Sequence, residues 1–254
     1  MEVLYIGHAS ILVREGNIMI ALDPFLSGEF YWEGQKETYQ GESPLIGNVD
    51  SFVENYADLI TAIAITHAHG DHFEPETIIK LVRKNPNIKL FTTRPILEWF
   101  RKSGMMSPLI SYSNRSVKWN GVYDIKSEGD HLTLGILPNP GIKKRQKPER
   151  VGFFISNDKD ASIAYVGDAH GAGDWEKFRH DVTDLILWPV EERGEIIEYF
   201  CEESQLKRIW WIHWEKFRPG NFTCSIDPQV LMNEFKALKI AQGILSFDKW
   251  ETLS

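Results

Sequence analysis

Short apolar runs recur along this chain of 254 residues, and many are followed by a stretch with the spacing of an amphipathic helix. The run 59–65 is rich in β-branched residues, which is typical of a strand buried on both faces. Strands that alternate with helices predict sheets covered by helices in layers, an α/β architecture. We find no sequence repeat, low-complexity tract or linker, so we expect a single domain over residues 1–254.

Periodicity and turn residues locate the expected elements. Strands are expected at 3–6, 11–13, 18–22, 59–65, 88–92, 151–156, 162–166, 185–188 and 209–212, with a meander over 117–137, and helices at 75–84, 96–102, 174–179, 195–203 and 228–240. Glu15-Gly16-Asn17 predicts a hairpin turn. Residues 27–48 are aromatic but aperiodic, which suits either a surface excursion or a loop that lines a substrate pocket.

Composition excludes some classes of protein. Hydrophobic residues make up 43% and charged residues 25%, a balance typical of globular proteins rather than disordered ones. The formal net charge of −8 repels nucleic-acid phosphates at long range, which argues against a nucleic-acid partner. The longest basic run (Lys143, Lys144, Arg145, Lys147 and Arg150) suits a solvated loop, although a local basic groove remains open as an alternative.

Cysteine usage and hydropathy indicate the compartment. Cys201 and Cys224 lack zinc-finger spacing, and two thiols do not make a disulfide framework in a chain of this size, although one disulfide between them stays open. No apolar stretch approaches the roughly 18 residues of a membrane span. The start, Met1-Glu2-Val3, lacks the basic region of a signal peptide. We therefore expect a cytoplasmic protein without a membrane span, and no sequence signal indicates its oligomeric state.

The segment Thr66-His67-Ala68-His69-Gly70-Asp71-His72 directly follows the predicted strand 59–65. Imidazole and carboxylate are ligands that zinc, iron and manganese accept. The end of a strand places them at the edge of a sheet, where ligands commonly bind. We expect Gly70 to allow a tight backbone turn, so that the side chains converge. This clustering predicts a transition-metal site rather than a solvated histidine-rich turn.

The segment 67–72 also resembles the H-x-H-x-D-H signature of the metallo-β-lactamase superfamily. The opening Gly7-His8-Ala9-Ser10, followed by Asp23-Pro24-Phe25, resembles the branch that contains ascorbate-6-phosphate lactonase and N-acyl-phosphatidylethanolamine phospholipase D. The resemblance implies a four-layer αββα sandwich. It also implies one or two divalent metals, with zinc expected first and manganese or iron as alternatives.

The family pattern assigns a ligand set. His67 and His69 would bind the first metal, and Asp71 and His72 the second. Asp168 follows a predicted strand and matches the carboxylate that bridges both metals. His213 follows the last apolar strand and matches the final histidine ligand, the alternative being a core histidine among tryptophans. The implied metal ligands are His67, His69, Asp71, His72, Asp168 and His213.

One ligand of the family has no counterpart. The family's histidine after a proline-containing turn falls on 137–141, which contains Asn139 but no histidine. His131 stands at the expected start of a strand, so we expect it on the surface. Asn139 or His170 is a candidate to complete the first site, and His8 is a candidate to line the centre. With fewer ligands, the first site is expected to bind metal more weakly than the second.

The resemblance implies a metal-dependent hydrolase that attacks its substrate through a metal-bound hydroxide. Asp71 would bind metal, orient the nucleophile and help to move protons. The expected substrate is a phosphate-bearing small molecule, an ester or a lactone, whose phosphate could meet the basic run. The alternatives are a phosphodiesterase or nuclease that uses the same metals, and a metal- or ligand-binding homologue that has lost catalysis.

Overall fold

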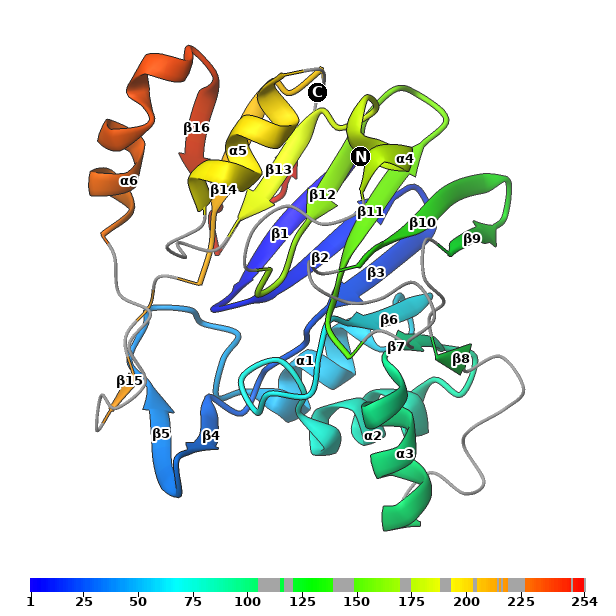
Figure 1. Cartoon of the computed structure of the whole chain (residues 1–254). Coiled ribbons are helices and arrows are strands. Elements are labelled where there is room, and N and C mark those ends of the chain that lie inside the picture. Colours follow the sequence, from blue (N-terminus) through cyan, green and yellow to red (C-terminus); the bar gives the residue numbers. More distant parts are fainter. Residues whose placement is uncertain are drawn as a thin grey trace.

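The computed structural model describes residues 1–104, 115–116, 121–138, 149–169, 175–187, 193–202, 205–213, 215, 217–218, 227–247 and 249–253. Asn139, His170, Cys224 and the basic residues at 143–147 lie outside this described part. Within it, the strands form two seven-stranded sheets and one three-stranded sheet (Figure 1). None of its helices combines the length and the apolarity that crossing a membrane requires.

The first large sheet has the strand order β17-β1-β2-β3-β6-β7-β8. Its strands are β1 (Glu2–Gly7), β2 (Ser10–Glu15), β3 (Ile18–Leu22), β6 (Ala62–Ile65), β7 (Lys89–Thr92), β8 (Arg115–Ser116) and β17 (Glu251–Thr252). The expected hairpin joins β2 to β3, with Glu15 paired to Ile18. Helices α1 (Val49–Tyr56), α2 (Pro75–Lys84) and α3 (Arg94–Ser103) pack on its outer face. Helix α2 begins and ends at the predicted residues, with proline in its first turn.

The second large sheet has the order β16-β14-β13-β12-β11-β10-β9. Its strands are β9 (Val122–Ser127), β10 (Asp130–Pro138), β11 (Val151–Asn157), β12 (Ser162–Tyr165), β13 (Asp184–Leu187), β14 (Arg208–Trp211) and β16 (Ala241–Ile244). Helices α4 (Glu176–Arg179), α5 (Arg193–Cys201) and α6 (Pro228–Glu234) pack against its outer face.

The period-2 alternation of side chains along the strands builds the layers. Val3 and Tyr5 of β1 belong to the core between the two sheets, whereas Leu4 belongs to the core under α1, α2 and α3. In the second sheet, Ile163 lies in the central core and Ala164 lies under α4, α5 and α6. Helices therefore cover the outer faces of two facing sheets, which confirms the predicted αββα sandwich.

Residues 27–48 form more regular structure than their pattern predicts. Strands β4 (Glu29–Trp32) and β5 (Gln35–Tyr39) make a hairpin that pairs with β15 (Phe217–Arg218) in the small sheet. In β4 only Phe30 is fully buried, so the segment lacks the apolar alternation that marks a half-buried strand. The hairpin projects away from the two large sheets (Figure 1).

Other elements also differ from the prediction. Helix α1 was missed because Phe52 is its one fully buried side chain, which is too weak a stripe to show as periodicity. The last helix was expected to reach residue 240 but ends at Glu234, and a 3₁₀ turn over Lys236–Leu238 follows. Lys239 then adopts a left-handed conformation, which cannot continue a helix. Strands β16 and β17 were not predicted either.

Candidate metal centre

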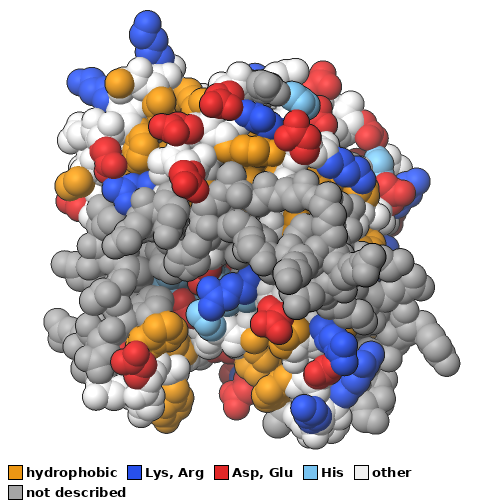
Figure 2. Space-filling model, viewed as in Figure 1, with side chains coloured by type: hydrophobic (Ala, Val, Ile, Leu, Met, Phe, Trp, Pro, Cys, Tyr) orange, Lys and Arg blue, Asp and Glu red, His pale blue; other side chains and the backbone are white. Residues whose placement is uncertain are grey.

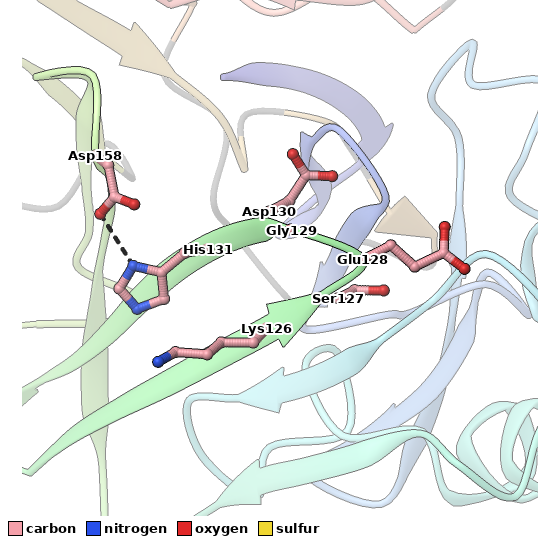
Figure 3. Close-up of a pocket in the computed structure, with 7 residues that line it drawn as sticks. All are labelled: Lys126, Ser127, Glu128, Gly129, Asp130, His131 and Asp158. Atoms are coloured by element: carbon pink, nitrogen blue, oxygen red, sulfur yellow. Dashed lines mark hydrogen bonds and ion pairs between the residues drawn. The ribbon is translucent and has the colours of Figure 1, made fainter.

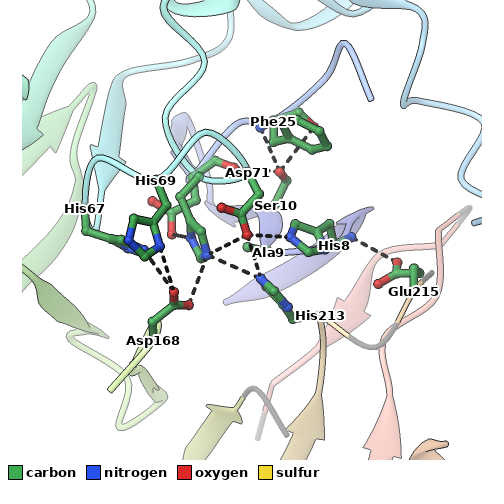
Figure 4. Close-up of polar contacts among 12 residues, drawn as sticks. His8, Ala9, Ser10, Phe25, His67, His69, Asp71, Asp168, His213 and Glu215 are labelled. Atoms are coloured by element: carbon green, nitrogen blue, oxygen red, sulfur yellow. Dashed lines mark hydrogen bonds and ion pairs between the residues drawn. The ribbon is translucent and has the colours of Figure 1, made fainter. Parts of the chain in front are cut away.

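The candidate site collects residues that lie within three positions after the ends of strands of both large sheets. His8 follows β1, Asp23 follows β3, and the segment that begins at His67 follows β6. From the second sheet, Asp168 follows β12 and His213 follows β14. Side chains at strand ends leave the hydrogen-bonded ladder and can converge at one edge. Segments that lie far apart in the sequence therefore meet at one place (Figure 4).

Two groups of potential ligands lie side by side there. One consists of His67, His69 and Asp168, and the other of His8, Asp71, His72 and His213. Within each group, one ligand atom per residue lies within 4.8 Å of the others. All seven side chains are buried except His69, which is 34% exposed. The structure thus brings together the six residues predicted as ligands and adds His8, which was predicted only to line the centre.

Asp168 stands between the two groups (Figure 4). Its Oδ2 atom lies 2.9 Å from Nε2 of His67, and its Oδ1 atom lies 3.0 Å from Nε2 of His72. One carboxylate thus faces a histidine of each group, which is the placement that a bridging ligand requires.

Several buried polar atoms of this cluster lack a hydrogen-bond partner among the described residues. They include Oδ1 of Asp71, and also Nε2 of His67 and Oδ1 of Asp168, whose short contacts with Asp168 and His72 are not aligned for hydrogen bonding. A buried polar atom without a partner costs about 1–3 kcal/mol. Imidazole nitrogens and carboxylate oxygens packed at such short distances can all be satisfied by one divalent cation. The residues present therefore fit a transition metal.

The histidines at the two ends of the cluster are neutral at pH 7. Burial, His67 and Arg150 lower the pKa of His69 to about 4. Burial and the neighbouring His213 lower the pKa of His8 to about 3. Neutral imidazole is the form that binds metals, so neither ring has to lose a proton first.

The pKa values of His72 and Asp168 are displaced in opposite directions. Burial alone would lower the pKa of His72, but Asp168, Asp71 and Asp23 raise it well above its ordinary value. Burial works to raise the pKa of Asp168, yet His72 and His67 hold it well below its ordinary range. A metal must therefore displace a proton from His72, and acidic conditions favour the metal-free state.

Asp23 supports the cluster from behind. Its carboxylate accepts hydrogen bonds from the backbone N–H of Thr66 (2.7 Å), the Thr66 hydroxyl (2.7 Å) and the Tyr165 hydroxyl (2.8 Å). Its Oδ2 atom also lies 2.8 Å from Nδ1 of His72, so Nε2 of that ring faces the centre. Such carboxylate–histidine pairs fix the orientation of a metal-binding ring. No role was predicted for Asp23 itself, although a carboxylate directly after a buried strand was a usable signal.

Ser10 connects the two sequence motifs near the N-terminus. Its hydroxyl donates to the carbonyl of Asp23 (2.6 Å) and accepts from the backbone N–H of Phe25 (2.8 Å). The pairing of Gly7-His8-Ala9-Ser10 with Asp23-Pro24-Phe25 therefore has a physical cause, because the first motif holds the turn formed by the second.

Glu215 is a second supporting carboxylate that was not predicted. It accepts hydrogen bonds from the backbone N–H of His8 (2.9 Å) and from the hydroxyls of Tyr5 (2.7 Å) and Tyr39 (3.2 Å). Tyr39 belongs to β5, so Glu215 ties the projecting hairpin to the loop that carries His213. No local pattern marks this residue, because its partners come from distant parts of the chain.

The backbone at the site is held in an uncommon conformation. His8, Asp23 and His213 have φ angles of 55°, 42° and 63°, a region that residues other than glycine seldom adopt. Such residues persist when surrounding contacts hold them, and they cluster at functional sites. The backbone N–H of His213 donates to the carbonyl of His8 at 2.9 Å, so two of the three stabilise each other.

Two glycines serve the site in different ways. Gly167 has a φ of 55°, and a Cβ there would lie 2.9 Å from Cγ2 of Thr66, so glycine lets Asp168 approach the histidine loop. Gly70 lies in the expected tight turn, in which the backbone N–H of His72 donates to the carbonyl of His69 at 3.0 Å, but its φ is not positive, so it does not supply a left-handed conformation there. It makes room for Phe30 instead, whose Cβ would lie 3.1 Å from an added Cβ.

The pattern of the Beta-lactamase superfamily domain matches residues 2–209 of this chain, which is most of its length. The chain belongs to the metallo-β-lactamase superfamily. The H-x-H-x-D-H segment at 67–72 and Asp168 lie inside the matched region, whereas His213 lies just beyond it.

The relatives that match this chain are named for different activities. The cytidine monophosphate-N-acetylneuraminic acid hydroxylase of Danio rerio is 30% identical over 164 residues, which are 62% of this chain and 25% of the relative. A UPF0173 metal-dependent hydrolase of Thermococcus kodakarensis is 26% identical over 192 residues, 75% of this chain and 72% of that protein. This chain therefore spans only about a quarter of the length of the hydroxylase.

A solved structure shows the same fold. The metallo hydrolase from Ignicoccus hospitalis superposes with a TM-score of 0.67 at 16% identity, covering 96% of this chain and 94% of that one. At this identity the likeness concerns the fold alone. It agrees with the αββα sandwich expected for the superfamily.

His131 lies on the surface, as predicted, near the start of β10. Its Nδ1 atom lies 2.9 Å from Asp158 and its Nε2 atom 3.1 Å from Asp124, in a shallow hollow at the β9–β10 turn (Figure 3). Hydrogen bonds to these two carboxylates raise the pKa of His131. Both ring nitrogens are thus engaged away from the candidate centre.

We therefore expect His131→Ala to leave the metal content of the protein unchanged, whereas His67→Ala lowers it. Elemental analysis of the two variants, purified in parallel without chelator, provides the comparison. If His131→Ala loses as much metal as His67→Ala, then His131 replaces the absent family histidine and the expected ligand set is wrong.

Proposed function

We propose that the protein is a metal-dependent hydrolase whose ligands are His67, His69, Asp71, His72, Asp168 and His213. The observation that carries the proposal is the position of Asp168, which lies within 3.0 Å of a histidine in each group. Two metals that share a carboxylate can act together on one substrate. Zinc is the first candidate for this set of nitrogen and oxygen donors, with manganese or iron as alternatives.

Bound divalent metals supply Lewis acidity, which makes water nucleophilic at neutral pH and polarises an ester carbonyl or phosphoryl group. Asp71 has the contacts to orient the attacking water by accepting a hydrogen bond from it. Its Oδ2 atom lies 3.0 Å from Nε2 of His8, while Oδ1 has no hydrogen-bond partner among the described residues. Although burial works to raise the pKa of Asp71, His72, His213 and His8 hold it well below the ordinary range, so it serves as an acceptor.

The proposed substrate is a phosphate-bearing small molecule, either an ester or a lactone. Support comes from the two motifs that resemble the ascorbate-6-phosphate lactonase branch, because their residues His8 and Asp23 both contact the cluster. A relative named for a cytidine monophosphate conjugate also agrees with a phosphate-bearing substrate. The formal net charge of −8 disfavours a nucleic acid as the natural substrate.

The test is hydrolysis of chromogenic substrates by protein loaded with zinc, manganese or iron. We expect turnover of a nitrophenyl phosphate monoester or of an aryl lactone, its loss after chelation, and its return when metal is added. Asp71→Asn is expected to reduce turnover strongly, whereas Asp58→Asn on the surface is a matched control. Preference for bis(nitrophenyl) phosphate would favour the phosphodiesterase alternative. Absence of any hydrolysis by fully loaded protein would contradict the proposal.

An oxygenase is the second candidate, since three relatives are named hydroxylases. This alternative predicts that the protein as purified contains iron and consumes oxygen with a reductant. Zinc-loaded protein that hydrolyses esters, together with iron-loaded protein that consumes no oxygen, would exclude it.

A further inference from the structure

A guanidinium group stands at the exposed side of the first ligand group. Nη2 of Arg150 lies 3.0 Å from Nε2 of His69, the one partly exposed member of the cluster. In the described part of the chain, no carboxylate forms an ion pair with Arg150. Figure 2 shows a basic side chain and a histidine side chain next to each other on one face of the molecule.

The backbone fixes Arg150 at this place. It directly precedes β11, and the backbone N–H of Val151 donates to the carbonyl of Thr66 at 3.1 Å. Thr66 in turn precedes His67. The residue before β11 is therefore tied to the loop that carries the first two histidines, and Arg150 is half-buried rather than free in solvent.

The contact between Arg150 and His69 changes when His69 binds a metal. A guanidinium only donates hydrogen bonds, so Nε2 of His69 accepts in this contact and Nδ1, which faces Asp168 at 3.8 Å, carries the ring proton. A neutral imidazole that binds metal through Nδ1 carries its proton on Nε2. Arg150 and His69 would then both be donors, and the guanidinium needs another acceptor.

The charge around the first group indicates which acceptor is suitable. Among the described residues, Asp168 is the one carboxylate within it, and Asp168 also faces His72 of the second group. Divalent metals together with Arg150 would leave an excess of positive charge that Asp168 and Asp71 do not balance. Guanidinium binds carboxylate and phosphate through paired charge-assisted hydrogen bonds. Trp32 of β4 lies against His69, with its ring centroid 5.6 Å from that of His69.

We propose that Arg150 determines specificity by binding an anionic group of the substrate, a carboxylate or a phosphate, beside His69 at the first ligand group. The proposal rests on the function proposed above and assigns the residue that would bind the anionic group of its substrate. Because Trp32 places an apolar ring beside the same histidine, the anion is expected to be attached to an apolar or planar portion.

The experiment measures the binding of two probes, inorganic phosphate and benzoate, to metal-loaded protein by calorimetry. It compares the wild type with Arg150→Met, Arg150→Lys and the control Arg14→Met. Arg14 pairs with Glu2 at the start of β1, the end of that strand opposite His8. We expect Arg150→Met to weaken the preferred anion about tenfold or more, and Arg150→Lys to weaken it less, with metal content unchanged in all variants.

The two probes distinguish the source of the anion, since tighter binding of phosphate indicates a phosphate-bearing substrate and tighter binding of benzoate indicates a carboxylate. Equal anion affinity in the wild type and Arg150→Met would overturn the proposal. Loss of metal in Arg150→Met would overturn it as well, because Arg150 would then act by positioning His69. Wild-type protein that takes up no metal would instead contradict the proposed function itself, and the two outcomes can be told apart.

Discussion

Asp168→Ala is expected to remove metal from both ligand groups at once. The two oxygens of Asp168 face His67 and His72 at 2.9 and 3.0 Å, so one substitution deletes a ligand on each side. Loss of an outer partner of a ligand already costs roughly 10- to 100-fold in metal affinity. Loss of a shared ligand should cost more at each site, and elemental analysis after dialysis measures the result.

Asp158→Ala is the matched control for this experiment. Asp158 is an exposed aspartate that contacts His131 and lies outside both ligand groups. We expect it to retain the metal content of the wild type. Retention of one full equivalent of metal by Asp168→Ala would show that this carboxylate belongs to one group and does not bridge the two.

Asp23→Ala is expected to lower the free energy of unfolding of the metal-free protein by about 3–5 kcal/mol. The carboxylate is fully buried, and its removal leaves the N–H and hydroxyl of Thr66 and the hydroxyl of Tyr165 without their acceptor. It also removes the contact that orients His72. Urea unfolding monitored by tryptophan fluorescence gives the stability, and metal titration gives the second effect, a loss of about 10- to 100-fold in affinity.

The control for Asp23 is Asp50→Ala, because Asp50 is 88% exposed and pairs with Lys80 on the surface. Exposed pairs contribute about 0–1 kcal/mol, so this variant should unfold almost as the wild type does. A similarly small effect of Asp23→Ala would mean that the Asp23 network is not a support of the site.

The site residues that were predicted from the sequence were all recognised from their immediate neighbours in the chain. His67, His69, Asp71 and His72 lie within one short segment, and Asp168 and His213 each follow a buried strand. Helix α2 was placed correctly because Pro75 and a strong apolar stripe mark it. Residues that are close in the sequence and also close in the fold could therefore be predicted from the sequence alone.

The residues that were missed depend on contacts between distant segments. Glu215 gains its role from His8, Tyr5 and Tyr39, none of which is near it in the chain. Phe30 likewise explains Gly70 only after the β4–β5 hairpin has folded beside the histidine loop. Such partners leave no periodicity or spacing that could be recognised beforehand.

The two groups are of unequal size in the described part of the chain, which agrees with the absence of one family histidine from the sequence. Among the described residues, the first group has two histidines and Asp168, whereas the second has Asp71, His72, His213 and the additional His8. Arg150 also places a positive charge beside His69 in the first group. Fewer ligands and a neighbouring cation both disfavour a cation there, so the first site should be the weaker one.

Titration of metal-free protein with zinc, followed by calorimetry and checked by elemental analysis, tests the central claim that this cluster holds metal in two unequal sites. We expect two steps of different affinity, the tighter one lost in His72→Ala and the weaker one lost in His67→Ala. One strong step alone would still agree with a weak first site. Uptake of less than about a tenth of an equivalent, or two equally tight steps, would contradict the account.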